Sequence, residues 1–113
     1  MKYSTEITDG IVVFRLSEKI MGGMETSEFL EDIRASIEKG HKNFIIDIAG
    51  IDWMNSTGTA VLISAYPSIR NGGGDLVMIG ITDKIESLFT ITKLISVFKF
   101  SNSFEEAKKY FQQ

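Results

Sequence analysis

The sequence predicts an α/β fold: a mixed sheet that opens with an antiparallel hairpin and continues with parallel strands, together with about four helices. The pair Asp9-Gly10 separates two runs rich in β-branched and aromatic residues, Lys2–Thr8 and Ile11–Leu16, and is typical of a two-residue hairpin turn. The run Phe44–Ala49, FIIDIA, is almost continuously apolar, as in a strand covered on both faces of a parallel sheet. Helix-like and strand-like patterns then alternate, which indicates right-handed crossovers between parallel strands.

The first helix is expected after the hairpin. We expect a loop over Ser17–Glu25, with Thr26 as the N-cap of the helix and Gly40 as the residue that stops it. Apolar residues recur between these two signals at helical spacing, namely Phe29, Leu30, Ile33 and Ile37. The pattern therefore predicts one amphipathic helix between the hairpin and the FIIDIA strand.

The FIIDIA run should be a central strand, and a helix and another strand are expected after it. The apolar pattern of Ala60–Ile69 predicts the second helix, and Asn71–Gly74 predicts the turn that follows it. Pro67 lies inside this helix and has no backbone N–H to donate, so we expect the helix to kink or end there. The next strand is expected at Asp75–Gly80.

The C-terminal part of the chain carries two helix-start signals. Asp83 and Glu86 have the spacing of a capping box, and so do Ser103 and Glu106. A short strand is expected between the two helices, near Val97–Phe100. The apolar residues expected to face inward are Ile85, Leu88 and Phe89 in the first helix and Phe104, Ala107 and Phe111 in the second.

The length and composition are those of an ordinary globular domain. At 113 residues the chain is long enough for one domain, residues 1–113, with its own hydrophobic core. The net charge of −3 gives no attraction to nucleic acid or to anionic membranes. No window approaches the ~20 apolar residues of a membrane span and no apolar signal segment opens the chain, so we expect a cytoplasmic protein.

Few residues in the chain suit catalysis or metal binding. Cysteine is absent, which excludes thiol catalysis and thiolate metal sites. His41 is the only histidine and follows a glycine in an expected loop, where a solvated side chain is the simplest interpretation. Gly72–Gly74 lacks the lysine of a phosphate-binding loop and precedes a strand. With no convergent acid–base pair, we expect no enzyme, no metal site and no cofactor.

The segment Asn55-Ser56-Thr57-Gly58 lies between the carboxyl end of the central strand and the second helix. Open α/β sheets place their working surfaces at this edge. Asn55 is a good N-cap, and the small residues after it leave the backbone approachable. Taken alone, the four residues favour an ordinary helix start over a functional site.

The longer run FIIDIAGIDWMNSTGTAVL resembles the corresponding segment of STAS domains, the anti-sigma factor antagonist family. That family has an apolar strand ending in Asp-Leu-Ser, then an aromatic and an aliphatic residue, then Asp-Ser-Ser/Thr-Gly and a small-residue helix. Asp47-Ile48 matches the strand end, Trp53-Met54 the aromatic and aliphatic positions, and Ser56-Thr57-Gly58 the motif. The resemblance extends over nearly the whole chain, including the hairpin, the glycine turn and the terminal helix.

The resemblance implies a protein that switches partners. In the family, the serine aligned with Ser56 is phosphorylated by a partner kinase that doubles as an anti-sigma factor; Thr57 would be the fallback acceptor. The unmodified domain would bind that kinase and the phosphorylated domain would release it, because a phosphate adds about −1.5 to −2 charges to a desolvated interface. A serine phosphatase is a further implied partner. We expect a monomer when the domain is free.

The expected partner-binding surface combines the motif with apolar residues near it. A glycine pair between two methionines favours a mobile loop that presents them, although each methionine or the tryptophan taken singly is typical of a core. The surface comprises Met21, Gly22, Gly23, Met24, Trp53, Asn55, Ser56, Thr57 and Gly58.

Among the positions that depart from the family pattern, Asn55 keeps an alternative open. The acid that usually precedes the serine is Asn55, and the family's Gly and Asp in the loop after the second strand correspond to Glu18 and Met21. Asn55 can cap a helix but cannot accept a proton or offer a negative charge to a kinase. The alternative is a non-phosphorylated STAS adaptor, such as a subunit of a lipid-transport ATPase or a scaffold of a stress complex. A small-molecule-binding module at the same edge is weaker, because no polar pocket can be inferred.

Overall fold

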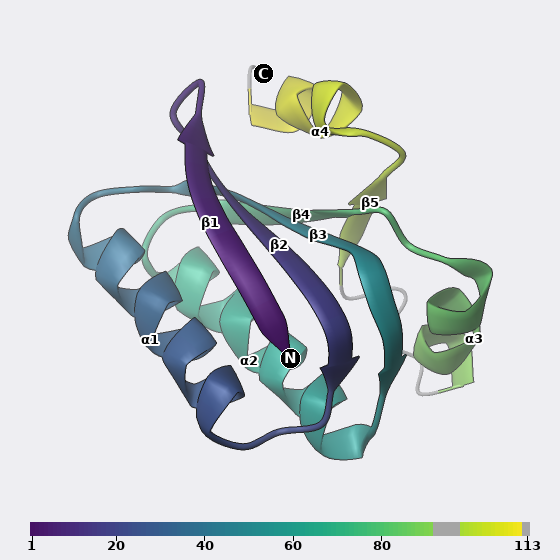
Figure 1. The fold of residues 1–113 in the computed structure, drawn as a ribbon. Coiled ribbons are helices and arrows are strands. Elements are labelled where there is room, and N and C mark those ends of the chain that lie inside the picture. The colour runs from purple at the N-terminus through teal and green to yellow at the C-terminus, as the bar shows by residue number, and fades with distance from the viewer. Residues whose placement is uncertain (92–97, 112–113) are drawn as a thin grey trace.

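The computed structural model describes residues 1–91 and 98–111, which form one five-stranded sheet with helices on both faces (Figure 1). In chain order the elements are β1 (Lys2–Thr8), β2 (Ile11–Ile20), α1 (Met24–Glu38), β3 (Asn43–Met54), α2 (Ser56–Asn71), β4 (Asp75–Ile79), α3 (Asp83–Ile91), β5 (Lys99–Ser101) and α4 (Phe104–Phe111).

The strands follow one another across the sheet in chain order, from β1 to β5. β1 and β2 are antiparallel, and every other neighbouring pair is parallel. Both turn residues between β1 and β2 have positive φ, 54° at Asp9 and 78° at Gly10, as in the turns that match the twist of a hairpin. The predicted mixed sheet with an N-terminal hairpin is confirmed.

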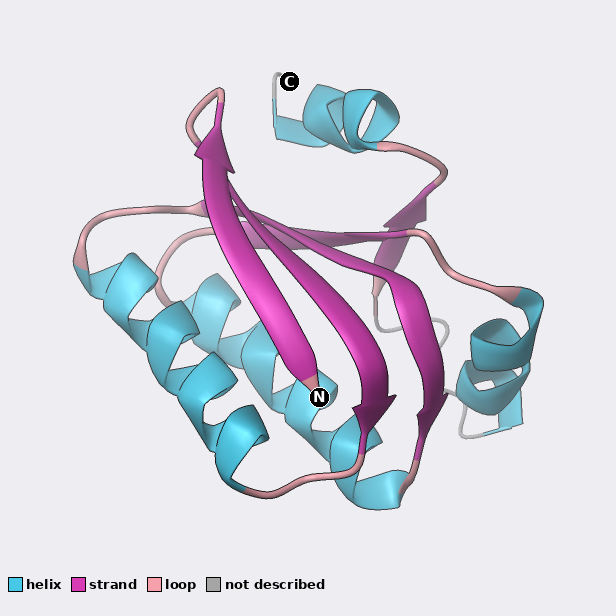
Figure 2. Ribbon diagram, viewed as in Figure 1, coloured by secondary structure: helices cyan, strands magenta, loops and turns pink. Residues whose placement is uncertain are grey.

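Each face of the sheet has its own hydrophobic core, with α1 and α2 below the strands and α4 above them in Figure 2. Phe44 and Ile46 of β3 contribute to the larger core, which also contains residues of α1, α2 and α3. Ile45, between them, contributes to the smaller core with Ala107 of α4. Because neighbouring side chains of a strand point to opposite faces, this double cover explains the continuous apolar run in the sequence.

β2 is longer than the sequence predicted. The expected loop Ser17–Glu25 is wrong in its first part, because β2 continues to Ile20. The strand does so through register shifts against β3 after Arg15 and after Glu18, and Glu18 has a left-handed φ of 72°. A bulge lets a strand bend and continue without a glycine or proline to mark the place. The loop that remains is Met21–Gly23.

α1 begins earlier than predicted and ends as predicted. Its N-cap is Gly23, not Thr26. Thr26 is buried, and its hydroxyl donates to the carbonyl oxygen of Gly23 at 2.6 Å. After the helix, Gly40 has a φ of 97°, the left-handed conformation that commonly ends helices.

α2 extends beyond the apolar run Ala60–Ile69: it begins after the predicted cap Asn55, and it ends later than predicted, at Asn71. Pro67 does not end the helix, which continues for another turn to Asn71. The missing N–H of Pro67 removes one intrahelical bond, but the segments on both sides of it are held on the sheet by buried side chains, namely Leu62, Ala65 and Ile69. Packing therefore outweighs the local effect of the proline.

The two predicted capping boxes have different outcomes. At α3 the cap is Thr82, whose hydroxyl oxygen accepts from the Ile85 N–H at 3.3 Å, so the prediction of Asp83 as the cap is wrong. At α4 the hydroxyl oxygen of Ser103 accepts from the Glu106 N–H at 3.2 Å, as predicted.

The predicted strand Val97–Phe100 lies partly outside the described residues. β5 spans Lys99–Ser101 and pairs in parallel with β4, whereas Val97 is outside the part of the chain that the structure describes.

Candidate functional site

The carboxyl ends of β2 and β3 form the edge of the sheet that carries the candidate site (Figure 1). Ile20 and Met54, the last residues of the two strands, are paired. The chain leaves β2 through the loop Met21–Gly23 into α1, and it leaves β3 through Asn55 into α2. The amino ends of α1 and α2 therefore lie at the same edge. We call this region the Ser56 edge.

Asn55 holds the start of α2. Its side-chain oxygen accepts a hydrogen bond from the Gly58 N–H at 2.8 Å. Its backbone carbonyl oxygen accepts from both the N–H and the hydroxyl of Thr59, each at 2.9 Å. Asn55 itself is extended, with φ −96° and ψ −176°, as N-caps usually are. The prediction of Asn55 as the N-cap is confirmed.

Asn55 also contacts the segment that follows β2. Its side-chain amide donates to the carbonyl oxygen of Met21 at 3.4 Å, and its backbone N–H donates to that of Ile20 at 3.3 Å. The first of these bonds is long, so it holds the loop weakly. An aspartate here could still cap α2, but it would have no proton to donate to Met21.

Two glycines allow the loop and α2 to approach closely. A Cβ on Gly58 would lie 1.8 Å from the carbonyl oxygen of Ile20. A Cβ on Gly22, whose φ is 86°, would lie 2.6 Å from the methyl carbon of Thr57. Gly58 is buried, so its inclusion in the exposed contact surface is corrected: this residue positions α2 against β2.

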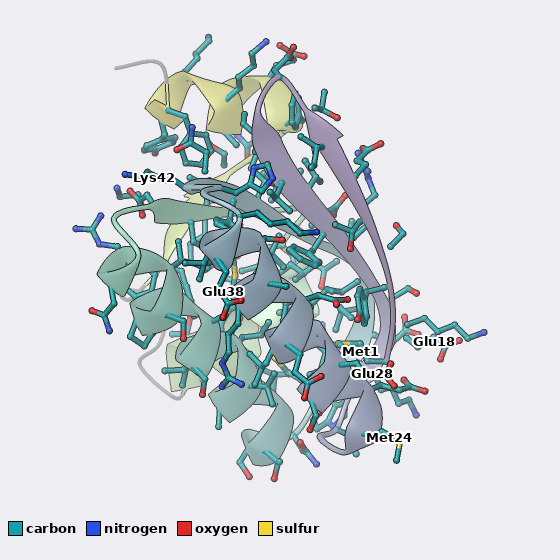
Figure 3. The ribbon with its side chains drawn as sticks, turned by 90° about the vertical axis from the view of Figure 1, so that its left-hand side faces the viewer. Met1, Glu18, Met24, Glu28, Glu38 and Lys42 are labelled. Atoms are coloured by element: carbon teal, nitrogen blue, oxygen red, sulfur yellow. The ribbon has the colours of Figure 1, made fainter. Side chains whose placement is uncertain are left out.

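The other predicted contact residues are arranged around an exposed Ser56. Ser56 and Thr57 are both solvent-exposed in the first turn of α2, as predicted for Ser56. Among the apolar side chains, Met24 is 80% exposed, Met21 47% and Trp53 39%. Met24 projects from the start of α1 (Figure 3). The reading of these three side chains as core residues is therefore excluded.

α3 contributes a residue that the sequence analysis missed. The ammonium group of Lys84 lies 5.4 Å from the centre of the Trp53 ring, within the range of a cation–π contact. The contact exists because α3 packs beside β3. A single lysine in a predicted helix gives no sequence signal for such a pair, so only the structure could reveal it.

Charged residues of both signs surround these apolar side chains. The exposed ones on neighbouring segments are Glu18, Lys19, Glu25, Asp52, Asp83 and Lys84. An apolar centre with a polar rim is the usual anatomy of a protein–protein contact surface. Within the described residues, no three His, Asp or Glu side chains are grouped as metal ligands. None of the described helices is long and apolar enough to span a bilayer.

Three features together characterise this domain: the strand order β1 to β5, the helices that connect the parallel strands, and the exposed Ser56 at the start of α2. The family model of the STAS domain matches residues 2–107, and the chain belongs to this family.

Two relatives are similar in sequence. BtrV of Bordetella bronchiseptica, named as a candidate anti-sigma factor antagonist, is 23% identical over 112 residues, which cover 99% of this chain and 96% of BtrV. The anti-sigma-B factor antagonist of Listeria monocytogenes is 35% identical over 57 residues, half of each chain.

SpoIIAA, an anti-sigma factor antagonist, is similar in structure. Its unphosphorylated form matches with a TM-score of 0.72 at 16% identity, covering 93% of this chain and 92% of SpoIIAA. The phosphorylated form from Bacillus gives 0.74 at 17% identity, with 97% and 99% covered. At these identities the likeness shows the fold alone.

Proposed function

We propose that this chain is an anti-sigma factor antagonist that works by partner switching. The Ser56 edge binds an anti-sigma factor that is also a serine kinase, and phosphorylation of Ser56 releases it. The observation that carries the proposal is an exposed serine at a helix start among exposed apolar side chains. The names of the two sequence relatives and of SpoIIAA support the class of function.

The position of Ser56 suits a reversible modification. At the amino end of α2, the helix dipole and unpaired backbone N–H groups favour a negative charge, so a phosphate there would leave the fold intact. The same phosphate would be costly inside an interface whose centre consists of Met21, Met24 and Trp53, because its charge would lose water without gaining a partner. The domain itself would perform no chemistry. A serine phosphatase would restore the binding form.

The site of modification can be tested directly. The chain is isolated from the cells that make it, and intact mass and peptide mapping locate any phosphate. One phosphate on Ser56, absent from the Ser56→Ala variant, is the expected result. Phosphate on Thr57 alone would move the switch to the neighbouring position. Phosphate only on Ser64, an exposed serine further along α2, would contradict the proposal.

A constitutive adaptor is the second candidate, and Asn55 favours it. This residue offers a kinase no carboxylate, and its side-chain amide instead donates a long, weak hydrogen bond to the Met21 carbonyl oxygen. An adaptor would bind its partner tightly and carry no phosphate on Ser56 or Thr57. If the kinase needs the acid, Asn55→Asp should raise the rate of phosphorylation by about 10²-fold, a typical general-base contribution. If the carboxylate only repels the new phosphate, the rate should fall or stay unchanged.

A further inference from the structure

β1 is the outer strand of the sheet, and its far side is open. It lies at one end of the strand order and pairs only with β2 among the described strands. All seven of its residues, Lys2–Thr8, are fully or partly exposed, and Ile7 is 60% exposed. An uncovered edge strand of this length is a template for another strand.

The hairpin register decides which backbone groups of β1 face outward. Thr8 and Ile11 flank the two-residue turn, so they form a hydrogen-bonded pair. Pairs alternate along an antiparallel ladder, so the N–H and C=O groups of Tyr3, Thr5 and Ile7 point away from β2. None of the backbone hydrogen bonds between the described elements involves these three residues.

We propose that this edge binds a second copy of the same chain, with the two β1 strands antiparallel and a two-fold axis at Thr5. In this register Thr5 faces Thr5 of the second copy, and Tyr3 faces Ile7. It is the register in which all three outward residues of each β1 find a partner. Three hydrogen-bonded pairs, each exchanging two bonds, would join the two sheets into one.

The side chains fit this register. Tyr3 would cover Ile7 of the second copy, and an aromatic ring opposite a β-branched residue is a favourable cross-strand pair. The Tyr3 hydroxyl donates to Asp32 at 2.5 Å, which fixes the ring beside α1. On the other face Ser4 would lie opposite Glu6, so no like charges are directly opposed.

The charges along α1 are also complementary under the same two-fold axis. Beside Lys2 and Tyr3, Glu25 and Glu28 of α1 line a surface depression, and Glu25 there contacts the ammonium of Met1 at 2.6 Å. Beside Ile7 a groove of about 250 Å³ is lined by Lys39, His41 and Asp32, and the Asp32 carboxylate already accepts from the Tyr3 hydroxyl. Antiparallel pairing brings Glu28 of one α1 toward Lys39 of the other. A parallel arrangement would oppose like charges.

This surface adjoins the Ser56 edge at Glu25 but does not include Ser56 or Trp53. Ser56 and Trp53 belong to α2 and β3, and β2 lies between β1 and β3. The inference goes beyond the proposed function and departs from the expectation of a free monomer. That expectation accompanied the family resemblance.

Sedimentation equilibrium across a range of protein concentrations tests the dimer. The wild type should shift with concentration from 12.6 kDa to twice that mass. Ile7→Lys and Thr5→Pro should remain monomeric at concentrations where the wild type is dimeric. The Thr5 N–H points outward, so proline there removes no internal bond. Met21→Lys changes an exposed apolar residue of the loop between β2 and α1, and as the matched control it should dimerise normally.

Single cysteines test the register, because the chain has none of its own. In a hydrogen-bonded pair the two Cα atoms are about 5.5 Å apart, so oxidation of Thr5→Cys should give a disulfide-linked dimer. In Ile7→Cys the two thiols would be displaced by four residues, about 14 Å along the strands, and should not link. Thr5 and Ile7 are both exposed, so random collision would link both variants.

Charge exchange tests the contact between the helices. Glu28→Lys and Lys39→Glu should each weaken the dimer, and a mixture of the two variants should restore it as a heterodimer. A wild type that stays monomeric at every concentration would overturn the proposal. So would a dimer that survives Ile7→Lys and Thr5→Pro, because it would use another surface. Whether Ser56 carries a phosphate does not depend on whether the chain forms this dimer, so the two proposals can fail separately.

Discussion

The Ser56 edge and the opposite edge of the sheet hold the chain in different ways. At the opposite edge, where β2 to β5 begin, ionic contacts clamp the elements together. Asp75 at the start of β4 contacts Lys99 of β5 and, at 3.7 Å, Arg70 of α2. Lys108 of α4 contacts Asp9 of the hairpin turn at 2.7 Å.

At the Ser56 edge, by contrast, the ion pairs lie on the elements beside the loop and not on the loop itself: the Met1 ammonium contacts Glu25 of α1 at 2.6 Å, and Lys2 contacts Glu18 of β2 at 3.4 Å. The loop Met21–Gly23 is tied to α2 by the 3.4 Å bond from Asn55. Apolar side chains are left exposed there, while glycines bring the backbones close together. The difference indicates that one edge maintains the fold and the other is free to contact a partner. Variants at the two edges should therefore separate stability from binding.

Gly58→Ala should have the largest effect. Its Cβ would lie 1.8 Å from the carbonyl oxygen of Ile20, so α2 or β2 must move. Overpacking of this kind should lower the free energy of unfolding by about 2–4 kcal/mol, measured by urea denaturation. Gly74→Ala is the matched variant at the opposite edge, where the Cβ would lie 2.0 Å from the carbonyl oxygen of Lys42. Both should lose stability, but only Gly58→Ala should speed hydrogen exchange in Met21–Gly23. Equal rates of hydrogen exchange in this loop in the two variants would contradict the difference between the two edges.

Asn55→Ala should have the next largest effect. It removes the cap of α2 and should lower the free energy of unfolding by about 1 kcal/mol. Asn55→Asp is the control: it keeps an oxygen for the Gly58 N–H and adds a negative charge that a helix start favours, so stability should be preserved. It loses the donor to Met21, so the loop should exchange faster. A large loss of stability in Asn55→Asp would mean that the contact with Met21 holds the fold.

Asp75→Asn should have a smaller effect at the opposite edge. It removes the charge that faces Lys99 and Arg70 but keeps an oxygen for the Leu76 N–H, now accepted at 2.8 Å. The loss should be about 0.5–1 kcal/mol and should diminish at high salt. Partner binding should be unchanged. Weaker binding with normal stability would place part of the contact surface at this edge.

Glu18→Gly should have the smallest effect and the opposite sign. Glu18 has a φ of 72°, which costs a non-glycine residue about 1–2 kcal/mol, and glycine removes that cost while losing about 0.5–1 kcal/mol of unfolded-chain entropy. The net gain in the free energy of unfolding should be about 0.5 kcal/mol. Lys19→Gly, in the same strand without a left-handed φ, should instead be destabilised. If Glu18→Gly and Lys19→Gly both lowered the free energy of unfolding, the left-handed conformation of Glu18 would not be strained.

The sequence was most informative where local chemistry and the fold agree. The hairpin turn Asp9-Gly10, the doubly covered run in β3 and the cap at Asn55 each carry a local signal that tertiary packing does not override. The family resemblance rested on the same segments, so the position of Ser56 at the start of α2 followed from them.

The rest depended on packing that the sequence does not display. The continuation of β2 through a left-handed Glu18 has no residue signal, because glutamate rarely adopts that conformation. Thr26 looked like a cap but is buried, and Gly23 takes its place. Pro67 looked like a helix end, but core contacts carry the helix past it. Lys84 reaches Trp53 only because α3 packs beside β3.

The central claim is that charge on Ser56 controls partner binding at this edge. The most direct measurement is the dissociation constant of the kinase that co-purifies with the wild type, for Ser56→Asp and for Ser64→Asp. Both variants add one negative charge to an exposed serine of α2. The account predicts that Ser56→Asp weakens binding by at least about 100-fold, the effect of an unpaired charge in an interface, whereas Ser64→Asp changes it little. Equal affinities for the two variants would contradict the account.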